Sequence, residues 1–240
     1  MRLDKLLANS GIGTRSDVRR MIARGLVKVN GTVVVKADFA VSDSDAVECA
    51  DQAVCSADKL YFLLDKPDEV LTAMEDPRLR NVGDFIPDRL KGRKLAPVGR
   101  LDYHTTGALI ITNDGTLSHR LQSPKYKIPK VYLVTFIGSA WTAAEVNEVA
   151  EGTVLTDKDI PCKTAGAKVF VRDNIHATIT LTEGKTHEVR RIFAHYNKEV
   201  TALRRISLGD IVIADDDTNT GDMRELTGDE VAKLLTSVGL

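Results

Sequence analysis

An aspartate in a glycine-bounded polar loop is the residue of this chain whose type and setting best suit chemistry. Asp102 lies in the segment 99–107, beside Arg100, and an apolar run over residues 108–112 follows directly. A rigid strand fixes the geometry of the loop that adjoins it, so reactive side chains are common in such loops. An ionised aspartate near an arginine keeps a low pKa and can act as a nucleophile or an electrostatic stabiliser. The alternative is that Asp102 forms only a structural ion pair, because the sequence alone does not show which arginine side chain contacts it.

A second polar loop, residues 182–187, leads into a helical pattern that carries Arg190 and Arg191. Other catalytic patterns are missing from the sequence: there is no G-x-S-x-G, no G-x-x-x-x-G-K and no G-x-G-x-x-G. The histidines also lack the spacing of a metal site; they are His104, His119, His176, His187 and His195. These absences argue against a nucleotide hydrolase, a dehydrogenase and a metalloenzyme.

Length and composition indicate one substantial core with a small accessory domain, since 43% of the 240 residues are hydrophobic. No apolar run reaches the roughly 18 residues that a membrane span needs. The first five residues include Asp4 and precede no apolar stretch, so we expect no signal peptide. Cys49, Cys55 and Cys162 are odd in number and lack metal spacing, which favours reduced thiols in a cytoplasmic protein.

The formal net charge of -1 hides an uneven distribution. Residues 1–36 hold only two acids, Asp4 and Asp17, against eight basic residues: Arg2, Lys5, Arg15, Arg19, Arg20, Arg24, Lys28 and Lys36. Residues 37–58 hold no lysine or arginine and six acids. A basic module followed by an acidic stretch predicts a polyanion-binding head, with the link to the main domain beginning near residue 50.

The basic module has clear local signals. Apolar residues from Leu3 predict a first helix that stops at Gly11, and residues 14–17 form a capping box for a second helix. Gly25 is placed to end that helix. The pair Asn30 and Gly31 predicts a type I′ turn between two short strands.

The remainder of the chain is rich in β-strand patterns with irregularly inserted helices. We expect strands at 61–64, 70–72, 108–112, 130–136, 168–171, 175–181, around 202–203 and at 211–213. We expect helices at 117–121, at 142–150, after residue 187 and from about 229, with one helical turn near 84–86. This order predicts an α+β fold on a mixed, largely antiparallel sheet and not a doubly wound fold.

The N-terminal residues resemble a known RNA-binding module. Residues 2–7, 14–22 and 25–31 look like the alpha-L (ribosomal S-four-like) domain, and the resemblance covers about residues 1–48. It implies that phosphates are bound by Arg2, Arg15, Arg19, Arg20, Arg24 and Lys28. The affinity for RNA should then fall steeply with salt.

The main domain is similar to the pseudouridine synthases of the RsuA type. The signature lies at residues 99–115, and the resemblance continues in order through 66–67, 118–121, 123–124, 130–134, 183–191, 203–206 and 224–227. It implies an alpha-L domain at 1–50, a linker at 51–59 and a catalytic domain at 60–240. Two positions depart from the family pattern. Asp68 and Glu69 follow Lys66-Pro67 where the family usually has a glycine two residues after the pair, and Ile192 replaces the usual methionine.

The resemblance implies that a uridine of rRNA is isomerised to pseudouridine. Asp102 matches the essential aspartate, Arg190 would pair with it, and Tyr132 would stack on the extruded base. The other expected substrate contacts are Arg100, Leu101, Lys130, Leu203 and Arg205. Neither a metal nor an organic cofactor is expected. Asp102 could attack the ribose or base covalently or stabilise a glycal-forming transition state, and the sequence does not choose.

The expected partner is 16S rRNA or a pre-small-subunit particle, bound by a monomeric protein that does not associate with membranes. The compact layout and the short segment after Leu226 resemble the small-subunit enzyme, which indicates uridine 516 of 16S rRNA as the target. A 23S rRNA enzyme of the same family is one alternative. A non-catalytic rRNA-binding assembly factor is the other.

Overall fold

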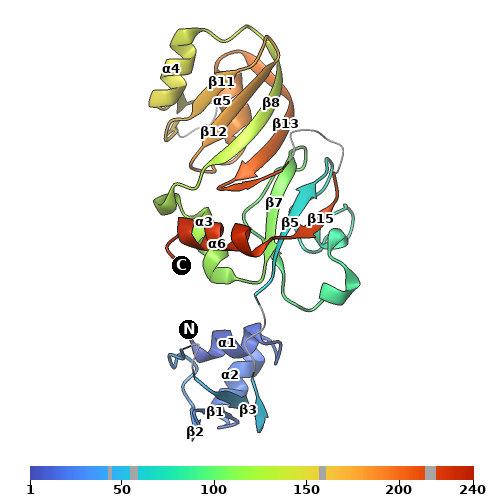
Figure 1. The fold of residues 1–240 in the computed structure, drawn as a ribbon, viewed down its shortest axis with the longest axis vertical. Helices are drawn as coiled ribbons and strands as arrows, with labels where there is room; N and C mark the ends of the chain where they lie inside the picture. Colours follow the sequence, from blue (N-terminus) through green and yellow to red (C-terminus); the bar gives the residue numbers. More distant parts are fainter. Residues whose placement is uncertain (43–44, 55–58, 157–160, 214–219) are drawn as a thin grey trace. The chain divides into compact units, whose positions relative to one another are not determined.

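A computed structural model describes the chain except residues 43–44, 55–58, 157–160 and 214–219. The chain divides into two compact units (Figure 1). The N-terminal unit comprises Met1–Lys59 together with Arg89–Leu95, and the large unit comprises Leu60–Asp88 and Ala96–Leu240. Each unit has its own core and is described by itself.

The N-terminal unit packs two helices against a small antiparallel sheet. The helices are α1 (Leu3–Asn9) and α2 (Arg15–Ala23), and the sheet order is β2-β1-β3-β4. The strands are β1 (Val27–Val29), β2 (Thr32–Val33), β3 (Val47–Cys49) and β4 (Gln52–Ala53). Its core holds Leu3, Leu7, Val18, Ile22, Val27, Val29, Val34, Val41 and Val47. The apolar periodicity read from the sequence therefore marks the buried face of both helices.

The turn and cap signals of this unit are confirmed. Thr14 and Asp17 form the reciprocal bonds of a capping box at the start of α2. Gly25 follows that helix with a positive φ of 72°. Asn30 and Gly31 have φ angles of 50° and 77°, as a type I′ turn between β1 and β2 requires.

The large unit is built on a mixed sheet of nine described strands, ordered β11-β12-β8-β13-β7-β5-β15, with β14 beside β13 and β6 beside β7. The long strands are β5 (Tyr61–Lys66), β7 (Thr106–Thr112), β8 (Lys130–Gly138), β12 (His176–Leu181) and β13 (Lys198–Leu208). The shorter ones are β6 (Ala96–Pro97), β11 (Lys168–Val171), β14 (Ile211–Val212) and β15 (Met223–Glu225). A separate pair is formed by β9 (Val154–Leu155) and β10 (Cys162–Lys163).

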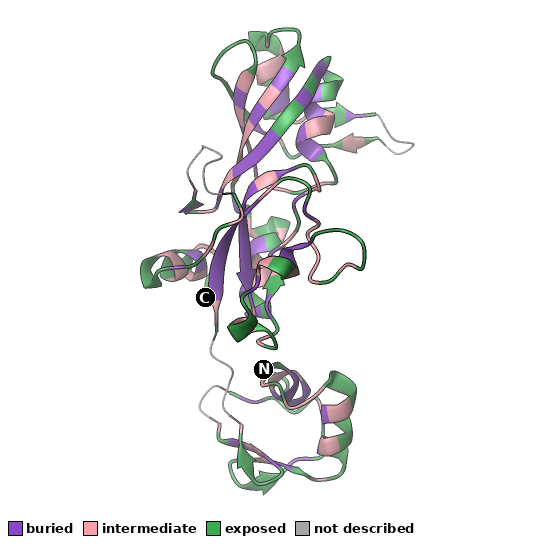
Figure 2. Cartoon of the chain, turned by 90° about the vertical axis from the view of Figure 1, so that its right-hand side faces the viewer, coloured by how far each residue is buried: buried purple, intermediate pink, exposed green. Residues whose placement is uncertain are grey.

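Helices divide the core of the large unit into two clusters. The first lies under β8, β12 and β13, where α4 (Ala143–Glu151) and α5 (Glu188–His195) contribute Val149, Val189, Ile192 and Phe193. The second lies beside β5 and β7, where α3 (Gly115–Gln122) and α6 (Gly228–Ser237) contribute Leu117, Leu121 and Leu234. Short 3-10 helices cover Val82–Phe85, Asp88–Leu90 and Pro124–Tyr126. β5 is buried along its whole length (Figure 2).

The two halves of the sheet join where β7 runs parallel to β13. The pairs Thr106–Arg204 and Gly107–Arg205 form this contact, and the other described strand pairs of the sheet are antiparallel. Gly107 has a φ of 101°, and a Cβ there would lie 2.3 Å from the backbone oxygen of Arg205. A glycine is therefore needed for the two strands to meet.

The α+β class and the mixed, mostly antiparallel sheet expected from the sequence are confirmed. The predicted strand at 70–72 is wrong: only an isolated bridge pairs Leu71 with Asn81. The sequence patterns did not predict β3, β4, β6, β9, β10 or β15, each of two or three residues. β4 also falls inside the segment expected to be a linker.

No helix in the described part of the chain is long and apolar enough to cross a membrane. Cys49 is buried and Cys162 is half-buried, and both are free thiols, whereas Cys55 lies outside the described residues.

Glu69 adopts a backbone conformation that favours glycine. Its φ is 55°, and it is the position at which the resembling family usually has glycine. The left-handed region costs a residue with a Cβ about 1–2 kcal/mol. The turn after Lys66-Pro67 is thus kept in this chain, with strain at Glu69.

We predict that Glu69→Gly stabilises the protein by about 0.5–1 kcal/mol, because relief of strain exceeds the extra unfolded-state entropy of glycine. Urea denaturation measures the free energy of unfolding. Glu69→Ala is the matched control and should leave stability within about 0.5 kcal/mol, since alanine carries the same Cβ strain. Destabilisation by Glu69→Gly would show that the φ of Glu69 carries no strain.

Candidate active site

A cavity of about 450 Å³ lies in the large unit, lined by side chains of both core clusters. Seven of the residues expected from the sequence to act in catalysis or substrate binding line it together: Arg100, Leu101, Asp102, Lys130, Tyr132, Leu203 and Arg205. They come from the loop before β7, from β8 and from β13. We call this space the first cavity.

Hydrogen bonds from Thr72 and Lys66 hold the loop that carries Asp102. Leu101 donates its N–H to Thr72 Oγ1 at 3.1 Å, and its carbonyl accepts from the same hydroxyl at 2.6 Å. The fully buried Lys66 donates through Nζ to the carbonyls of Pro67 and Tyr103 at 2.9 and 3.2 Å. A turn closes the loop, because Thr105 N–H donates to the Asp102 carbonyl. Asp102 is therefore presented on a fixed backbone.

His104, two residues after Asp102, fixes the far end of this loop. Its Nδ1 lies 3.1 Å from Asp68 Oδ1, and its carbonyl accepts from Arg190 Nη2 at 2.9 Å. Arg190 also donates Nη1 to the Val200 carbonyl at 2.9 Å. The side chains of Asp68 and Arg190 thus hold His104 from two elements, the turn after β5 and helix α5.

The structure corrects one expectation about Arg190. Its guanidinium does not pair with Asp102 among the described residues; it donates instead to two backbone carbonyls. Arg190 lines a second cavity of about 820 Å³, which shares Asp102, His187 and Leu203 with the first. From helix α5 it joins the loop 99–107 to β13 through these two bonds.

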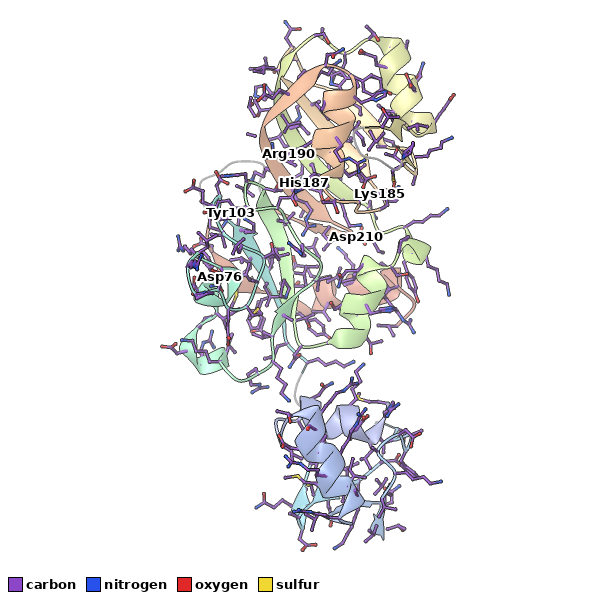
Figure 3. The ribbon with its side chains drawn as sticks, turned by 180° about the vertical axis from the view of Figure 1, so that it is seen from behind. Asp76, Tyr103, Lys185, His187, Arg190 and Asp210 are labelled. Carbon is purple, nitrogen blue, oxygen red and sulfur yellow. The ribbon has the colours of Figure 1, made fainter. Side chains whose placement is uncertain are left out.

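His187 was not among the expected site residues, yet it is a neighbour of Asp102. Its Nε2 lies 3.6 Å from Asp102 Oδ1, and both side chains are partly exposed. Figure 3 shows His187 and Arg190 close together, with Tyr103 on the neighbouring loop. His187 lies in the motif 183–191, but no local sequence pattern indicates which residue of that motif faces Asp102.

Tyr132 and Arg205 form one wall of the first cavity as cross-strand partners on β8 and β13. Arg205 is almost fully buried and donates Nε to the Ala108 carbonyl at 2.7 Å. Its Nη2 is buried without a partner in the described part of the chain. A buried donor of this kind costs free energy unless a ligand satisfies it. Leu203, also on β13, adds an apolar surface.

Burial lowers the pKa of two lysines beside the site. Burial lowers the pKa of Lys66 to about 8, and the charges of Asp68 and Asp102 only partly offset it. Burial also lowers the pKa of Lys130, and the charge of Arg205 adds to that effect. Lys130 donates Nζ to the Glu183 carbonyl at 3.1 Å. The positive charge around Asp102 is thus dense and poorly solvated.

The basic residues of the N-terminal unit fall into two groups. Arg2 and Arg19 both bind the buried carboxylate of Asp4, Arg20 pairs with Asp17, and Lys28 pairs with Asp51. Burial raises the pKa of Asp4, but its hydrogen bonds to the two arginines outweigh that and lower it. Arg15 and Arg24 are exposed and have no ion pair within the described ranges. The paired arginines are pre-positioned, and the other two are free to meet a ligand.

No group of three or more His, Cys, Asp or Glu side chains suited to a metal ion occurs among the residues that the structure describes.

Comparison with known families fits this geometry. The model for RNA pseudouridylate synthases matches residues 60–195, and the model for the S4 domain matches residues 1–47. The chain belongs to the RNA pseudouridylate synthase family. It is an isomerase acting on RNA, with an N-terminal S4 domain that binds RNA and a pseudouridine synthase domain. This assignment replaces the alternative of a non-catalytic assembly factor.

Individual relatives match along the whole synthase. The chain is 35% identical to "Ribosomal small subunit pseudouridine synthase A" of Haemophilus influenzae, covering 98% of this chain and 100% of the relative. It is also 35% identical to "Ribosomal large subunit pseudouridine synthase B" of Bacillus subtilis, covering 97% and 95%. A solved "pseudouridylate synthase" is 33% identical, with a TM-score of 0.69, covering 98% and 99%.

A buried ion pair supports the synthase domain beside its site. Arg204 on β13 donates both Nη1 and Nη2 to Asp65 on β5, at 2.9 and 2.7 Å. β7 lies between these two strands, so the pair spans the strand that leads out of the loop carrying Asp102. Its bidentate geometry offsets the cost of burying two charges.

We predict that Asp65→Asn destabilises the protein by about 3–5 kcal/mol, because it removes the carboxylate charge that both Nη groups of the buried Arg204 guanidinium bind. The free energy of unfolding in urea is the measurement. The double variant Asp65→Leu with Arg204→Met should recover stability to within about 1 kcal/mol of wild type, since both charges are then absent. A single variant as stable as wild type would contradict this role.

Proposed function

We propose that this synthase isomerises uridine 516 of 16S rRNA and that Asp102 is its catalytic residue. The observation that carries the proposal is the first cavity, which is lined by Asp102 together with Tyr132, Leu203 and Arg205. Its volume of about 450 Å³ falls in the range that suits a small ligand such as one nucleoside.

The reaction needs no group from outside the RNA. The N1–C1′ bond breaks, the base rotates, C5 bonds to C1′, and the proton lost from C5 is balanced by one gained at N1. Asp102 would meet the positive charge that develops at the ribose, either as a nucleophile or as an electrostatic stabiliser. Tyr132 would stack on the detached base, and Leu203 would pack against the same ring. These contacts would keep the base in place while it turns.

Arg190 serves in this proposal as a positioning residue. Its bond to the His104 carbonyl fixes the end of the loop that carries Asp102, and its bond to Val200 anchors that loop to β13. The base contacts would come from Lys130 and Arg205, whose cationic groups line the first cavity. The unpartnered Nη2 of Arg205 suits a carbonyl oxygen of uracil.

The uridine must leave its helix before C1′ can reach Asp102, and unstacking a base costs a few kcal/mol. Phosphate contacts by the S4 domain would supply part of this free energy, with Arg15 and Arg24 as the cations without an ion pair in the described structure. Arg2, Arg19, Arg20 and Lys28 would add contacts through donors not used by their carboxylate partners. Arg100, exposed at the mouth of the first cavity, would contact the RNA there.

The small-subunit target is supported by similarity to the Haemophilus influenzae small-subunit synthase over its whole length. The equal identity to the Bacillus subtilis large-subunit synthase makes a 23S rRNA uridine the alternative. Within the cell we expect the substrate to be 16S rRNA or a pre-small-subunit particle, met by a cytoplasmic monomer.

We predict that Asp102→Asn lowers the rate of pseudouridine formation by about a thousandfold or more, because the amide cannot carry the carboxylate's charge or attack. Release of label from [5-³H]uridine rRNA measures turnover, and filter binding should show RNA affinity within about threefold of wild type. Asp210→Asn is the matched control, since Asp210 is exposed and lines neither cavity. An Asp102→Asn enzyme with wild-type turnover would refute the catalytic assignment.

We predict that a strain lacking this gene loses one carbodiimide-dependent reverse-transcription stop, at uridine 516 of 16S rRNA. Restoring the wild-type gene should restore the stop, and restoring the Asp102→Asn gene should not. Loss of a stop in 23S rRNA would instead support the alternative target. Unchanged stops throughout both rRNAs would contradict an rRNA substrate.

A further inference from the structure

A buried glutamate, Glu188, lies at the start of α5 and takes no part in the reaction proposed above. Glu188 is only 4% exposed and lines the first cavity. Its Oε2 accepts the N–H of Lys185 at 2.9 Å, and its own N–H donates to the Lys185 carbonyl at 3.2 Å. These reciprocal bonds close a tight turn over Thr186 and His187.

The turn holds His187 in a costly conformation. His187 has a φ of 52°, in the left-handed region, where a residue with a Cβ loses about 1–2 kcal/mol. Such a conformation persists only when surrounding bonds impose it. Since His187 Nε2 lies 3.6 Å from Asp102, the bonds of Glu188 set the position of the histidine next to the catalytic aspartate.

A second carboxyl group faces Glu188 from the preceding loop. Glu183 accepts the N–H of Ala165 through Oε1 and binds Lys185 Nζ through Oε2, and Lys185 Nζ also donates to the Lys163 carbonyl. Burial raises the pKa of Glu183, but hydrogen bonds to Glu188, Lys185 and Ala165 outweigh it and lower the pKa. Glu183 is therefore the ionised member of the pair.

The remaining oxygen of Glu188 lacks a donor. Oε1 is buried and has no hydrogen-bond partner in the described structure when Glu188 is written as a carboxylate. The Glu183 carboxyl lies in the same turn, because both carboxyl groups bind Lys185: Glu188 accepts its backbone N–H and Glu183 binds its Nζ. Two adjacent buried carboxylates cannot both remain ionised at low cost. One shared proton would remove their repulsion and would also give Oε1 of Glu188 a hydrogen-bond partner.

We propose that Glu188 is a carboxylic acid that donates its proton to the Glu183 carboxylate, and that this bond positions His187 beside Asp102 during isomerisation. The proposal rests on the catalytic role of Asp102 stated above. Glu188 is a positioning residue in this scheme, since it acts on the reaction through the loop 183–187.

The charges around Glu188 predict the direction of its pH dependence. Burial raises its pKa to about 7, and the hydrogen bond to Glu183 adds to the shift, while the Lys185 bond and charge oppose it. Lys130 on β8 also faces the pair, with Arg205 on β13 behind it and His187 on the loop. Below pH 7 the proton is present and the loop is held. Above it, Glu183 and Glu188 repel each other and the turn loosens.

We predict that wild-type kcat/KM falls about tenfold between pH 6 and pH 8, as expected for loss of a proton with a pKa near 7. Glu188→Gln supplies a neutral side chain that can donate to Glu183 and accept from Lys185 N–H. Its rate should equal the wild-type rate at pH 6 within about threefold and should not show the tenfold fall by pH 8. Glu188→Ala, which makes neither bond, should be slow at both pH values.

The assay uses full-length enzyme with complete 16S and 23S transcripts, so an error in the proposed target does not hide the effect. Parallel pH profiles for wild type and Glu188→Gln would overturn the proposal, as would a Glu188→Gln enzyme inactive at pH 6. Activity of Asp102→Asn at pH 6 would instead reject the proposed function. A direct readout is the carboxyl ¹³C resonance that Glu188→Gln lacks. Its titration midpoint should be near 7, and a midpoint near the ordinary value of about 4.3 would also overturn the proposal.

Discussion

The close parallel contact between β7 and β13 is the constraint on which the active site depends. Gly107 allows the backbone of Arg205 to approach to a distance that no Cβ would permit. This contact joins a half-sheet that carries Asp102 to a half-sheet that carries Tyr132, Leu203 and Arg205. Because each half has its own apolar core, a cavity remains between them at the join. The first cavity is thus a consequence of how the two halves meet.

Cationic side chains of the large unit are unusually well buried around that join. Lys66, Arg204 and Arg205 are each at most 5% exposed, and their partners include backbone carbonyls and the Asp65 carboxylate. Lys66 holds the loop that carries Asp102, and Arg205 places a cationic group at the wall of the first cavity before RNA arrives. Such preorganisation places charge where the reaction needs it, with little reorganisation during turnover.

Sequence patterns predicted the features that depend on local chemistry. The capping box at residues 14–17, the Asn30–Gly31 turn and the long strands could be read from residue types, and the α+β class followed from their order. The three residues of β15 are too few to show a periodic pattern, and they pair with the longer strand β5. The prediction that Arg190 pairs with Asp102 was wrong for a related reason. Arg190 and His187 lie on the same motif, and which one faces Asp102 depends on a left-handed turn stabilised by Glu188.

A structure of the Asp102→Asn enzyme bound to a 16S rRNA fragment that contains uridine 516 tests the central claim most directly. The account predicts an extruded uridine in the first cavity, its ring against Tyr132 and its C1′ about 3–4 Å from the side chain of residue 102, as a reacting pair requires. A uridine that stays stacked in the RNA, or that binds away from residue 102 while the S4 domain holds the fragment, would contradict it.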